Sequence, residues 1–387
     1  MDRKKKTVVL ISLSAILMFL SGCSNGCGEE IKGNGPYSEG IVYSWGLNSR
    51  GQLGDGTTTD RSRPEEIPDL KGVITVSGGE KHTVALKSDG KVLSWGENSF
   101  GQLGDGTTDS RLSPEEISGI NDAVAVKAGE FHTSVLKSDG TVWNAGWNFC
   151  GVLGDGTDSD SSTVVQVAGL GDVVAIKTKL AHTAALRSDG TVWSWGLNVH
   201  GQLGDGTEED QIVPVMVAGL TDVVDVEAGE MHTVALRSDG TVWAWGWNDF
   251  GQLGDGTKED RLTPLKVVGL SGVVDIEVGE IHSVALGSDG TVWAWGENSF
   301  GQLGDGTVNE RLTPVKVIYL SDVVAIAAGN NHTAALRSDG TVWAWGENSF
   351  GQLGDGTTDD RFSPGEVVDL TGITAIAAGA NHTLAIK

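Results

Sequence analysis

The segment GQLGDGT returns every 50 residues along this chain, seven times and without an insertion. Copies begin at Gly51, Gly101, Gly201, Gly251, Gly301 and Gly351, and a near copy, GVLGDGT, begins at Gly151. A histidine recurs in step, at His82, His132, His182, His232, His282, His332 and His382. A period this long and regular indicates one supersecondary unit copied in space. We therefore interpret what occurs seven times as architecture, and we look for function where the copies differ.

Each copy predicts four short β-strands, as residues 290–336 illustrate. Residues 291–295 are aromatic and β-branched and are followed by a glycine-rich, turn-forming loop. Residues 314–318 begin with proline, which predicts an edge strand. Residues 323–327 and 332–336 are apolar runs that predict two further strands. Four strands per copy and no helical periodicity indicate an all-β fold, a seven-bladed β-propeller with four-stranded blades.

The phase of the repeat predicts how the ring closes. The repeat begins in the middle of a hairpin, at residues 41–45, and it stops at residues 383–387. Every internal HTxAL strand leads into a TVWxWG strand, but the last has no successor and the first TVWxWG-like strand has no predecessor. We predict that these two terminal strands pair, because closure removes the exposed sheet edges.

The first 22 residues are predicted to be a signal peptide. Four basic residues precede an apolar stretch, residues 7–19, that is too short to span a bilayer. The sequence Leu20-Ser21-Gly22-Cys23 resembles the lipobox of bacterial lipoproteins, which implies cleavage before Cys23 and a lipid on that cysteine. An ordinary cleaved signal with a chance cysteine is the alternative.

This start predicts the organisation and the location of the chain. Residues 23–40 are glycine-rich and polar, which is typical of a flexible tether, and residues 41–387 hold the propeller. Ser24 after the cysteine, where aspartate would favour inner-membrane retention, favours the outer membrane or the cell surface. Multiple acyl chains on Cys23 would anchor the chain firmly in the cell envelope.

The net charge of −25 weighs against binding to nucleic acid, because such a chain repels phosphate backbones. Solubility alone explains this charge, and attraction of a basic partner is the sharper interpretation. Cys27 and Cys150 lie far apart in sequence, so no disulfide framework is implied.

The patterns GxVWxWGxNxxGQLGDGT and AGxxHTxAL, over residues 41–387, resemble the repeat of the regulator of chromosome condensation family. This resemblance implies the seven-bladed propeller already counted. It also implies nucleotide exchange on a small nuclear GTPase through an inserted hairpin, and docking on chromatin. The equal length of all copies, the signal peptide and the acidic charge weigh against those activities here. Bacterial relatives act outside the cytoplasm, so the resemblance implies binding of a protein by loops of one propeller face.

Two recurring patterns could be interpreted as metal-binding sites, and both also have a structural explanation. Seven histidines at equivalent blade positions lie too far apart for one zinc ion, so we predict that each imidazole bridges two blades by a hydrogen bond. The DGT turn with a later acid, as in Asp55 with Asp60, offers oxygen ligands for calcium. The alternating Asp and Asn residues of an EF-hand loop are missing, and Asp-Gly is an ordinary turn sequence. We therefore favour a structural turn.

Catalysis has little support in the sequence. No GxSxG, HExxH or P-loop motif occurs. Cys150 with His200 as its base would need two neighbouring blades to bring them together. A carbohydrate-binding or carbohydrate-active protein is the main alternative function, and an enzyme of this kind would need carboxylates or histidines at the ring axis. We find no asymmetric acidic pair to nominate there, and we predict no enzyme, cofactor or metal.

The variable positions supply the candidate partner-binding residues. They are Trp147, Phe149, Trp247, Phe250, His200 and Lys179. Tryptophan in a loop either packs into a blade junction or stands exposed as an interface anchor. The third copy departs most, with Ala145, Val152, Val164, Ser161 and Thr178-Lys179-Leu180, and Gln211 departs in the fourth. Drift of a degenerate repeat and a specialised patch both explain these departures.

Four glutamates precede the histidine strands, namely Glu80, Glu130, Glu230 and Glu280. If their loops share a face, they form a broken ring of negative charge that attracts a basic protein, or merely a solvated rim. We thus predict a monomeric, lipid-anchored envelope propeller that binds another protein through loops of one face.

Overall fold

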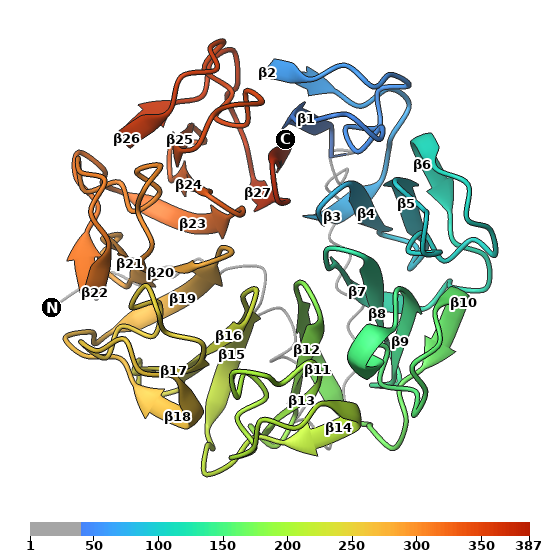
Figure 1. The fold of residues 1–387 in the computed structure, drawn as a ribbon. Helices are drawn as coiled ribbons and strands as arrows, with labels where there is room; N and C mark the ends of the chain where they lie inside the picture. The colour runs from blue at the N-terminus through green and yellow to red at the C-terminus, as the bar shows by residue number, and fades with distance from the viewer. Residues whose placement is uncertain (1–39) are drawn as a thin grey trace, which may run out of the picture.

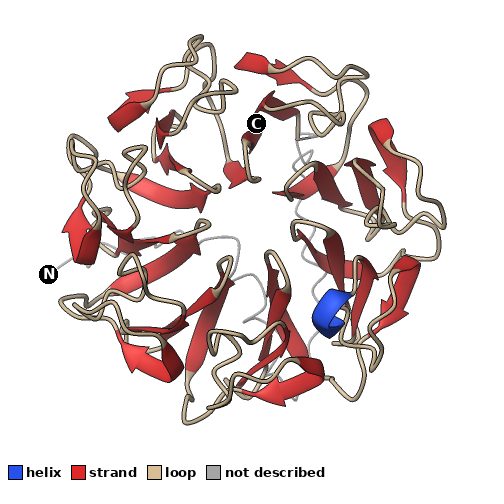
Figure 2. Cartoon of the chain, viewed as in Figure 1, coloured by secondary structure: helices blue, strands red, loops and turns tan. Residues whose placement is uncertain are grey.

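The computed structural model describes residues 40–387, which form a ring of seven four-stranded antiparallel sheets (Figure 1). Each sheet is one blade, and the innermost strands contact one another all around the ring axis. Figure 2 shows that the described chain is strands and loops apart from one short helical turn, η2 (Phe149–Gly151). The predicted all-β, seven-bladed fold is confirmed.

We number the blades from the first complete one. Blade 1 contains β3 (Val73–Gly78), β4 (His82–Lys87), β5 (Val92–Gly96) and β6 (Arg111–Glu116). Blade 2 contains β7 (Ala123–Ala128), β8 (His132–Lys137), β9 (Val142–Gly146) and β10 (Ser161–Gln166). Blade 3 contains β11 (Val173–Thr178), β12 (His182–Arg187), β13 (Val192–Gly196) and β14 (Gln211–Met216). Blade 4 contains β15 (Val223–Ala228), β16 (His232–Arg237), β17 (Val242–Gly246) and β18 (Arg261–Lys266).

The remaining blades follow the same plan. Blade 5 contains β19 (Val273–Val278), β20 (His282–Gly287), β21 (Val292–Gly296) and β22 (Arg311–Lys316). Blade 6 contains β23 (Val323–Ala328), β24 (His332–Arg337), β25 (Val342–Gly346) and β26 (Arg361–Glu366). Blade 7 contains β27 (Ala375–Ala378), β28 (His382–Ile386), β1 (Val42–Gly46) and β2 (Arg61–Glu66).

The two ends of the chain close the ring, as the phase of the repeat predicted. In blade 7 the last strand, β28, pairs antiparallel with the first strand, β1, with Val42 opposite Ile386 and Gly46 opposite His382. Just outside the ladder, Ile41 and Lys387 exchange both backbone hydrogen bonds, at 3.2 and 2.9 Å. The sheet order β2-β1-β28-β27 therefore joins the first and the last strand in one blade (Figure 1).

The core lies between blades, where indoles form its largest buried side chains. Trp95 is fully buried, and its Nε1 donates to the backbone carbonyl of Gln52 in the preceding blade at 2.9 Å. The same bond recurs at Trp45, Trp195, Trp245, Trp295 and Trp345. Blade 2 has Ala145 at this position and so lacks the indole. The recurring tryptophan therefore stabilises the blade junctions and is not a binding residue.

The seven histidines bridge adjacent blades, as predicted. The Nε2 of His82 lies 3.1 Å from the hydroxyl of Thr133, and equivalent contacts of 3.0–3.3 Å complete the ring. The hydroxyl of Thr133 itself donates to the carbonyl of Gln102, so the imidazole is the donor in the first bond. Each ring is buried, and burial lowers the histidine pKa values to about 3 or 4.

One predicted strand is displaced by three residues at its start. Residues 314–318 were expected to form it, but β22 spans Arg311–Lys316 and holds Pro314 inside. Gly296 pairs with Arg311, and the register then shifts before Ala294 pairs with Val315, so a bulge absorbs the proline. The strand is outermost in its blade, as its proline predicted.

The predicted signal peptide (residues 1–22), most of the predicted tether (residues 23–40) and Cys23 lie outside the described residues. Within residues 40–387, no helix is both long and apolar enough to cross a membrane.

Candidate functional site

The long glycine-rich loops and the short loops before the histidine strands open on the same side of the ring, because both follow strands that run in the same direction. We call this side the loop face. The SDG turns and the connections between blades lie on the opposite face. All six candidate binding residues belong to loops of the loop face.

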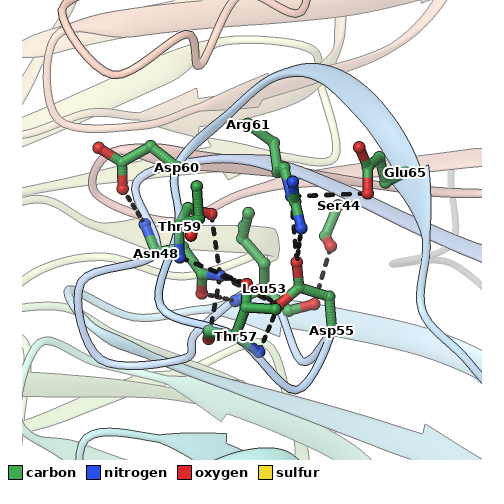
Figure 3. A network of polar contacts seen from close by, with 9 residues as sticks. All are labelled: Ser44, Asn48, Leu53, Asp55, Thr57, Thr59, Asp60, Arg61 and Glu65. Carbon is green, nitrogen blue, oxygen red and sulfur yellow. Dashed lines mark hydrogen bonds and ion pairs between the residues drawn. The ribbon is translucent and has the colours of Figure 1, made fainter.

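A buried asparagine organises each long loop (Figure 3). The Asn48 side chain donates to the carbonyls of Thr57 and Thr59 and accepts from the Leu53 amide at 3.0 Å. The backbone amide of Asn48 donates a hydrogen bond to the Asp60 carboxylate at 2.7 Å. Because these bonds recur at the other asparagines of the series, the loop backbone is nearly the same in every blade.

The aspartate of each DGT turn is engaged by protein groups, in support of the structural interpretation. Asp55 accepts from Thr57 and Asn48 and forms an ion pair with Arg61 at 2.8 Å (Figure 3). Burial works to raise the pKa of Asp55, but the bonds from Thr57 and Arg61 outweigh it and hold the pKa below its usual value. In five of the seven loops an arginine forms an ion pair with this aspartate. Within residues 40–387, no group of three metal-binding side chains suits an ion.

Aromatic side chains gather where the loops differ between copies. In blades 1 and 2, Phe100, Phe131 and Trp147 form one cluster with ring centroids 5.6–6.4 Å apart. Phe149 stacks on Trp147 at 5.4 Å and stays 61% exposed, although it is a large apolar side chain. The first predicted candidates, Trp147 and Phe149, therefore lie together on the surface.

A second cluster continues over blades 3 and 4. The Trp247 ring lies 5.7 Å from His200 and 5.5 Å from Phe250. His200 is held by Asp260, with 2.8 Å between Nδ1 and the carboxylate. These rings are half-buried against one another, and His200 and Trp247 come from the loops of neighbouring blades. We call the two clusters together the aromatic arc: Phe100, Phe131, Trp147, Phe149, His200, Trp247 and Phe250.

The loop face is thus divided into two halves. The backbone amide of Trp147 donates to the Phe131 carbonyl, which sets the tryptophan beside the short loop before the histidine strand. The same bond in blades 5 and 6 sets Glu297 beside Ile281 and Glu347 beside Asn331. The backbone is shared, so only the side chains make one half aromatic and the other half largely polar.

Cys150 and His200 do not form a catalytic pair. Burial, with a hydrogen bond to Asp210, raises the pKa of the Cys150 thiol to about 12. His200 is instead engaged by Asp260 and Trp247 in the next loop. The thiol therefore stays protonated, and its hydrogen-bond partner is Asp210 and not His200.

A group of charged side chains lies on the innermost strands near the ring axis, and it corrects the sequence analysis, which found no asymmetric acidic pair there. We call it the axial group: Lys127 on β7, Lys177 on β11, Asp225 and Glu227 on β15, and Asp275 and Glu277 on β19. Blades 6 and 7 carry only alanines at the same positions, namely Ala325, Ala327, Ala375 and Ala377. The sequence feature that could have revealed this group is the pair of strands VVDVEA and VVDIEV. Their aspartates and glutamates stand at positions where the other copies carry alanine, serine, threonine or lysine.

The axial group is only partly neutralised by its own lysines. Lys177 is buried and bonds to Glu227, and it lies 3.8 Å from Asp225. Asp275 is 5% exposed and forms no ion pair with any residue in 40–387. Burial and the neighbouring Asp225 and Glu277 raise the pKa of Asp275 well above its usual value. Lys177 beside it, together with burial, lowers the pKa of Lys127 to about 8.

The predicted ring of glutamates lies above the axial group, where the axis opens on the loop face. Backbone bonds from Glu130 to Lys179 (3.1 Å) and from Glu230 to Glu280 (3.3 Å) join these short loops around the axis. We call Glu80, Glu130, Glu230, Glu280 and Lys179 the mouth group. Lys179 stands where the other blades have glycine, and its amide bond to His182 is long, at 3.4 Å against 2.8–2.9 Å elsewhere.

Crowding of carboxyl groups perturbs the mouth group. Burial raises the pKa of Glu130 to about 7, with Lys179 opposing and the other glutamates adding to the shift. Burial and a hydrogen bond with Glu280 raise the pKa of Glu230 to about 7 as well. Burial lowers the pKa of Lys179. The mouth group is therefore short of positive charge in spite of its lysine.

Sequence comparison finds similarity to proteins built from the same repeat. One stretch of 49 residues is 49% identical to the E3 ubiquitin-protein ligase HERC2 of Homo sapiens. The matched stretch makes up 12% of this chain and 1% of HERC2. Another is 41% identical over 51 residues to the ultraviolet-B receptor UVR8 of Arabidopsis thaliana, 13% of this chain and 12% of that protein. The chain thus matches only a small part of these relatives.

Solved propellers share the whole fold. Prp20p from Saccharomyces cerevisiae, described with its binding to Gsp1p and histones, has a TM-score of 0.81 at 24% identity and covers 90% of this chain and 91% of its own. Human WBSCR16 has the same score and identity and covers 90% and 98%.

Family models match most of the propeller. The model of the regulator of chromosome condensation (RCC1) repeat matches residues 39–86 and 89–136. The model of the RCC1-like domain matches residues 172–387, more than half of the chain. With the seven-bladed ring and its repeated histidine strands, these matches show that the chain belongs to the RCC1 repeat family.

Proposed function

We propose that this chain is a lipid-anchored propeller of the bacterial cell envelope that binds a protein partner through its loop face. The aromatic arc is the observation that carries this proposal. It places two tryptophans and four phenylalanines on one half of one face, with Phe149 61% exposed. Tryptophan is a preferred anchor residue of protein interfaces, because it buries a large area at low entropic cost.

Two further observations support binding over a purely structural role. The arc lies on loops whose asparagine-centred hydrogen bonds recur in all blades, so its aromatic side chains are not needed to build the loop. Relatives of the same fold are described with protein partners: Prp20p with Gsp1p and histones, and with Kap60. The acidic charge of −25 makes a basic partner surface more suitable than DNA.

The test compares the arc with its counterpart on the polar half of the face. Tagged chain is recovered from native cell envelopes, and bound proteins are identified by mass spectrometry. We expect Trp147→Ala and Trp247→Ala to lose a partner that the unchanged chain retains, while Phe350→Ala, which removes an aromatic side chain from the corresponding long loop of blade 6, retains it. An unchanged melting temperature shows that the ring stays folded. Equal recovery by all variants would refute the proposed face.

The anchor and the location are tested separately. We propose that Cys23 carries the lipid and holds the propeller at the outer membrane or the cell surface. Metabolic labelling with a fatty acid should mark the unchanged chain and not Cys23→Ala, which should appear in the soluble fraction. A labelled Cys23→Ala chain would contradict the assignment.

A further inference from the structure

The charges at the ring axis indicate what the partner contributes there. The axial group supplies four carboxyl groups and two lysines, and the mouth group adds Lys179 with Glu130, Glu230 and Glu280. Glu80 is already paired with Lys81 at 2.6 Å. Seven carboxyl groups thus share three lysines, in surroundings where unpaired charge is costly.

Asp275 shows that this deficit is not met within the described chain. It is 5% exposed, it belongs to the innermost strand β19, and its only hydrogen bond comes from the neighbouring amide of Ile276. A buried carboxylate normally has a cationic or hydrogen-bonding partner. Two residues along the same strand, Glu277 also lacks an ion pair among the residues described.

The pKa values of these acidic residues are raised, as expected for carboxyl groups that are crowded together without a cation between them. Burial raises the pKa values of Asp275 and Glu277, with further contributions from neighbouring acids. At the mouth, Glu230 shares a hydrogen bond with Glu280. Protons therefore take the place of missing positive charge.

The group is also open to the loop face and placed beside the aromatic arc. Glu277 is the next-to-last residue of β19, and Glu280 follows it in the short loop at the mouth of the axis. The charged blades 2 to 5 overlap the blades of the arc, and small alanines face them from blades 6 and 7. A long basic side chain, flanked by apolar residues, fits this arrangement in charge and in length.

We propose that the mouth of the ring axis is a cation site that accepts a lysine or arginine side chain of the protein partner, between Glu230, Glu280 and Glu277. This inference rests on the proposed binding face and specifies the chemistry of its partner. The ammonium or guanidinium group replaces the proton that Glu230 holds near neutral pH. Binding near neutral pH is therefore accompanied by proton release.

The test uses the full chain and a pair of matched peptides, acetyl-Phe-Lys-Phe-amide and its norleucine analogue. Calorimetry should show at least tenfold tighter binding of the lysine peptide. Its heat should differ between phosphate and Tris buffers at pH 7, because Tris takes up the released protons with a large heat. Glu280→Gln and Asp275→Asn should each reduce the preference for lysine, whereas Asp339→Asn, in an exposed turn of the opposite face, should not.

Each other outcome has one meaning. Equal binding of both peptides, or an undiminished preference in both acid variants, overturns the cation site. Butylamine binding as tightly as the lysine peptide also overturns it, because the ligand would then be a free amine. If the envelope recovery finds no partner but the lysine preference holds, the proposed function fails while the cation site stands. If a partner binds the arc without any lysine preference, the reverse is true.

Discussion

At the residue scale, asparagine is the most demanding position of the repeat. Asn348 is fully buried in a loop that carries few other buried polar side chains. Its side chain donates to the carbonyls of Thr357 and Asp359 and accepts from the Leu353 amide at 2.9 Å. Removing it leaves several backbone groups without partners, and each such buried group costs about 1–3 kcal/mol.

We therefore expect Asn348→Ala to lower the free energy of unfolding by at least about 2 kcal/mol. The measurement is urea unfolding followed by tryptophan fluorescence. Ser349→Ala, the exposed neighbour, is the control and should stay within about 0.5 kcal/mol of the unchanged chain. Equal unfolding of the two variants would show that the loop does not depend on the asparagine.

The buried indole is the second residue on which every blade junction but one depends. Trp295→Ala removes a fully buried side chain and its bond to the Gln252 carbonyl at 2.9 Å. Loss of a buried tryptophan costs about 3–5 kcal/mol. Trp293→Ala, on the half-buried side of the same strand, should cost clearly less in the same urea titration. A larger loss at Trp293 would overturn this account of the junction.

At the scale of elements, the clasp of blade 7 is the contact on which ring closure depends. Strand β28 has partners on both sides, β27 and β1, so both chain ends are held by one sheet. Ile41 and Lys387 form a hydrogen-bonded pair, which makes the adjacent pair, Val42 and Ile386, a non-hydrogen-bonded one. Side chains approach most closely at such pairs, so this site suits a disulfide.

We expect the double variant Val42→Cys, Ile386→Cys to be more stable oxidised than reduced, by on the order of 5 kcal/mol in the chain-entropy model. The comparison is made within one protein, so the loss of buried methyl groups cancels. The single variant Val42→Cys should show no such difference. Identical melting temperatures of the oxidised and reduced double variant would mean that the clasp does not limit unfolding.

At the scale of the whole molecule, the fold followed from the sequence more completely than the site did. Seven equal copies and a repeat that starts mid-hairpin predicted the blades and the clasp. The aromatic arc was also predictable, because Trp147 and Trp247 replace acidic residues or leucine in a constant loop. The axial group was not predicted, because the inner strand was analysed in the copy at residues 323–327, which is apolar and carries none of these charges. Only the packing of neighbouring blades brings Lys177 to Glu227, 50 residues away.

The ring of histidines predicts how the stability of the whole propeller depends on pH. Burial lowers the pKa of these seven imidazoles from 6.5 to about 3 or 4, so the unfolded chain takes up protons first as the pH falls. Their contribution is complete above pH 6.5 and is lost below it, by about 2 kcal/mol for each histidine at pH 5. Glu130 and Glu230 act in the opposite sense, because their raised pKa of about 7 makes folding less favourable at higher pH.

Seven histidines outweigh two glutamates, so stability should rise with pH up to about pH 7, level off above it, and fall steeply below about pH 6.5. The urea midpoint, measured from pH 8 to pH 4.5, tests this shape. His332→Gln lowers stability at every pH, but it also removes one titrating group, so its slope below pH 6 should be shallower by one proton. An unchanged slope in this variant, or a midpoint that stays level down to pH 4.5, would mean that the interblade imidazoles are not held neutral by burial.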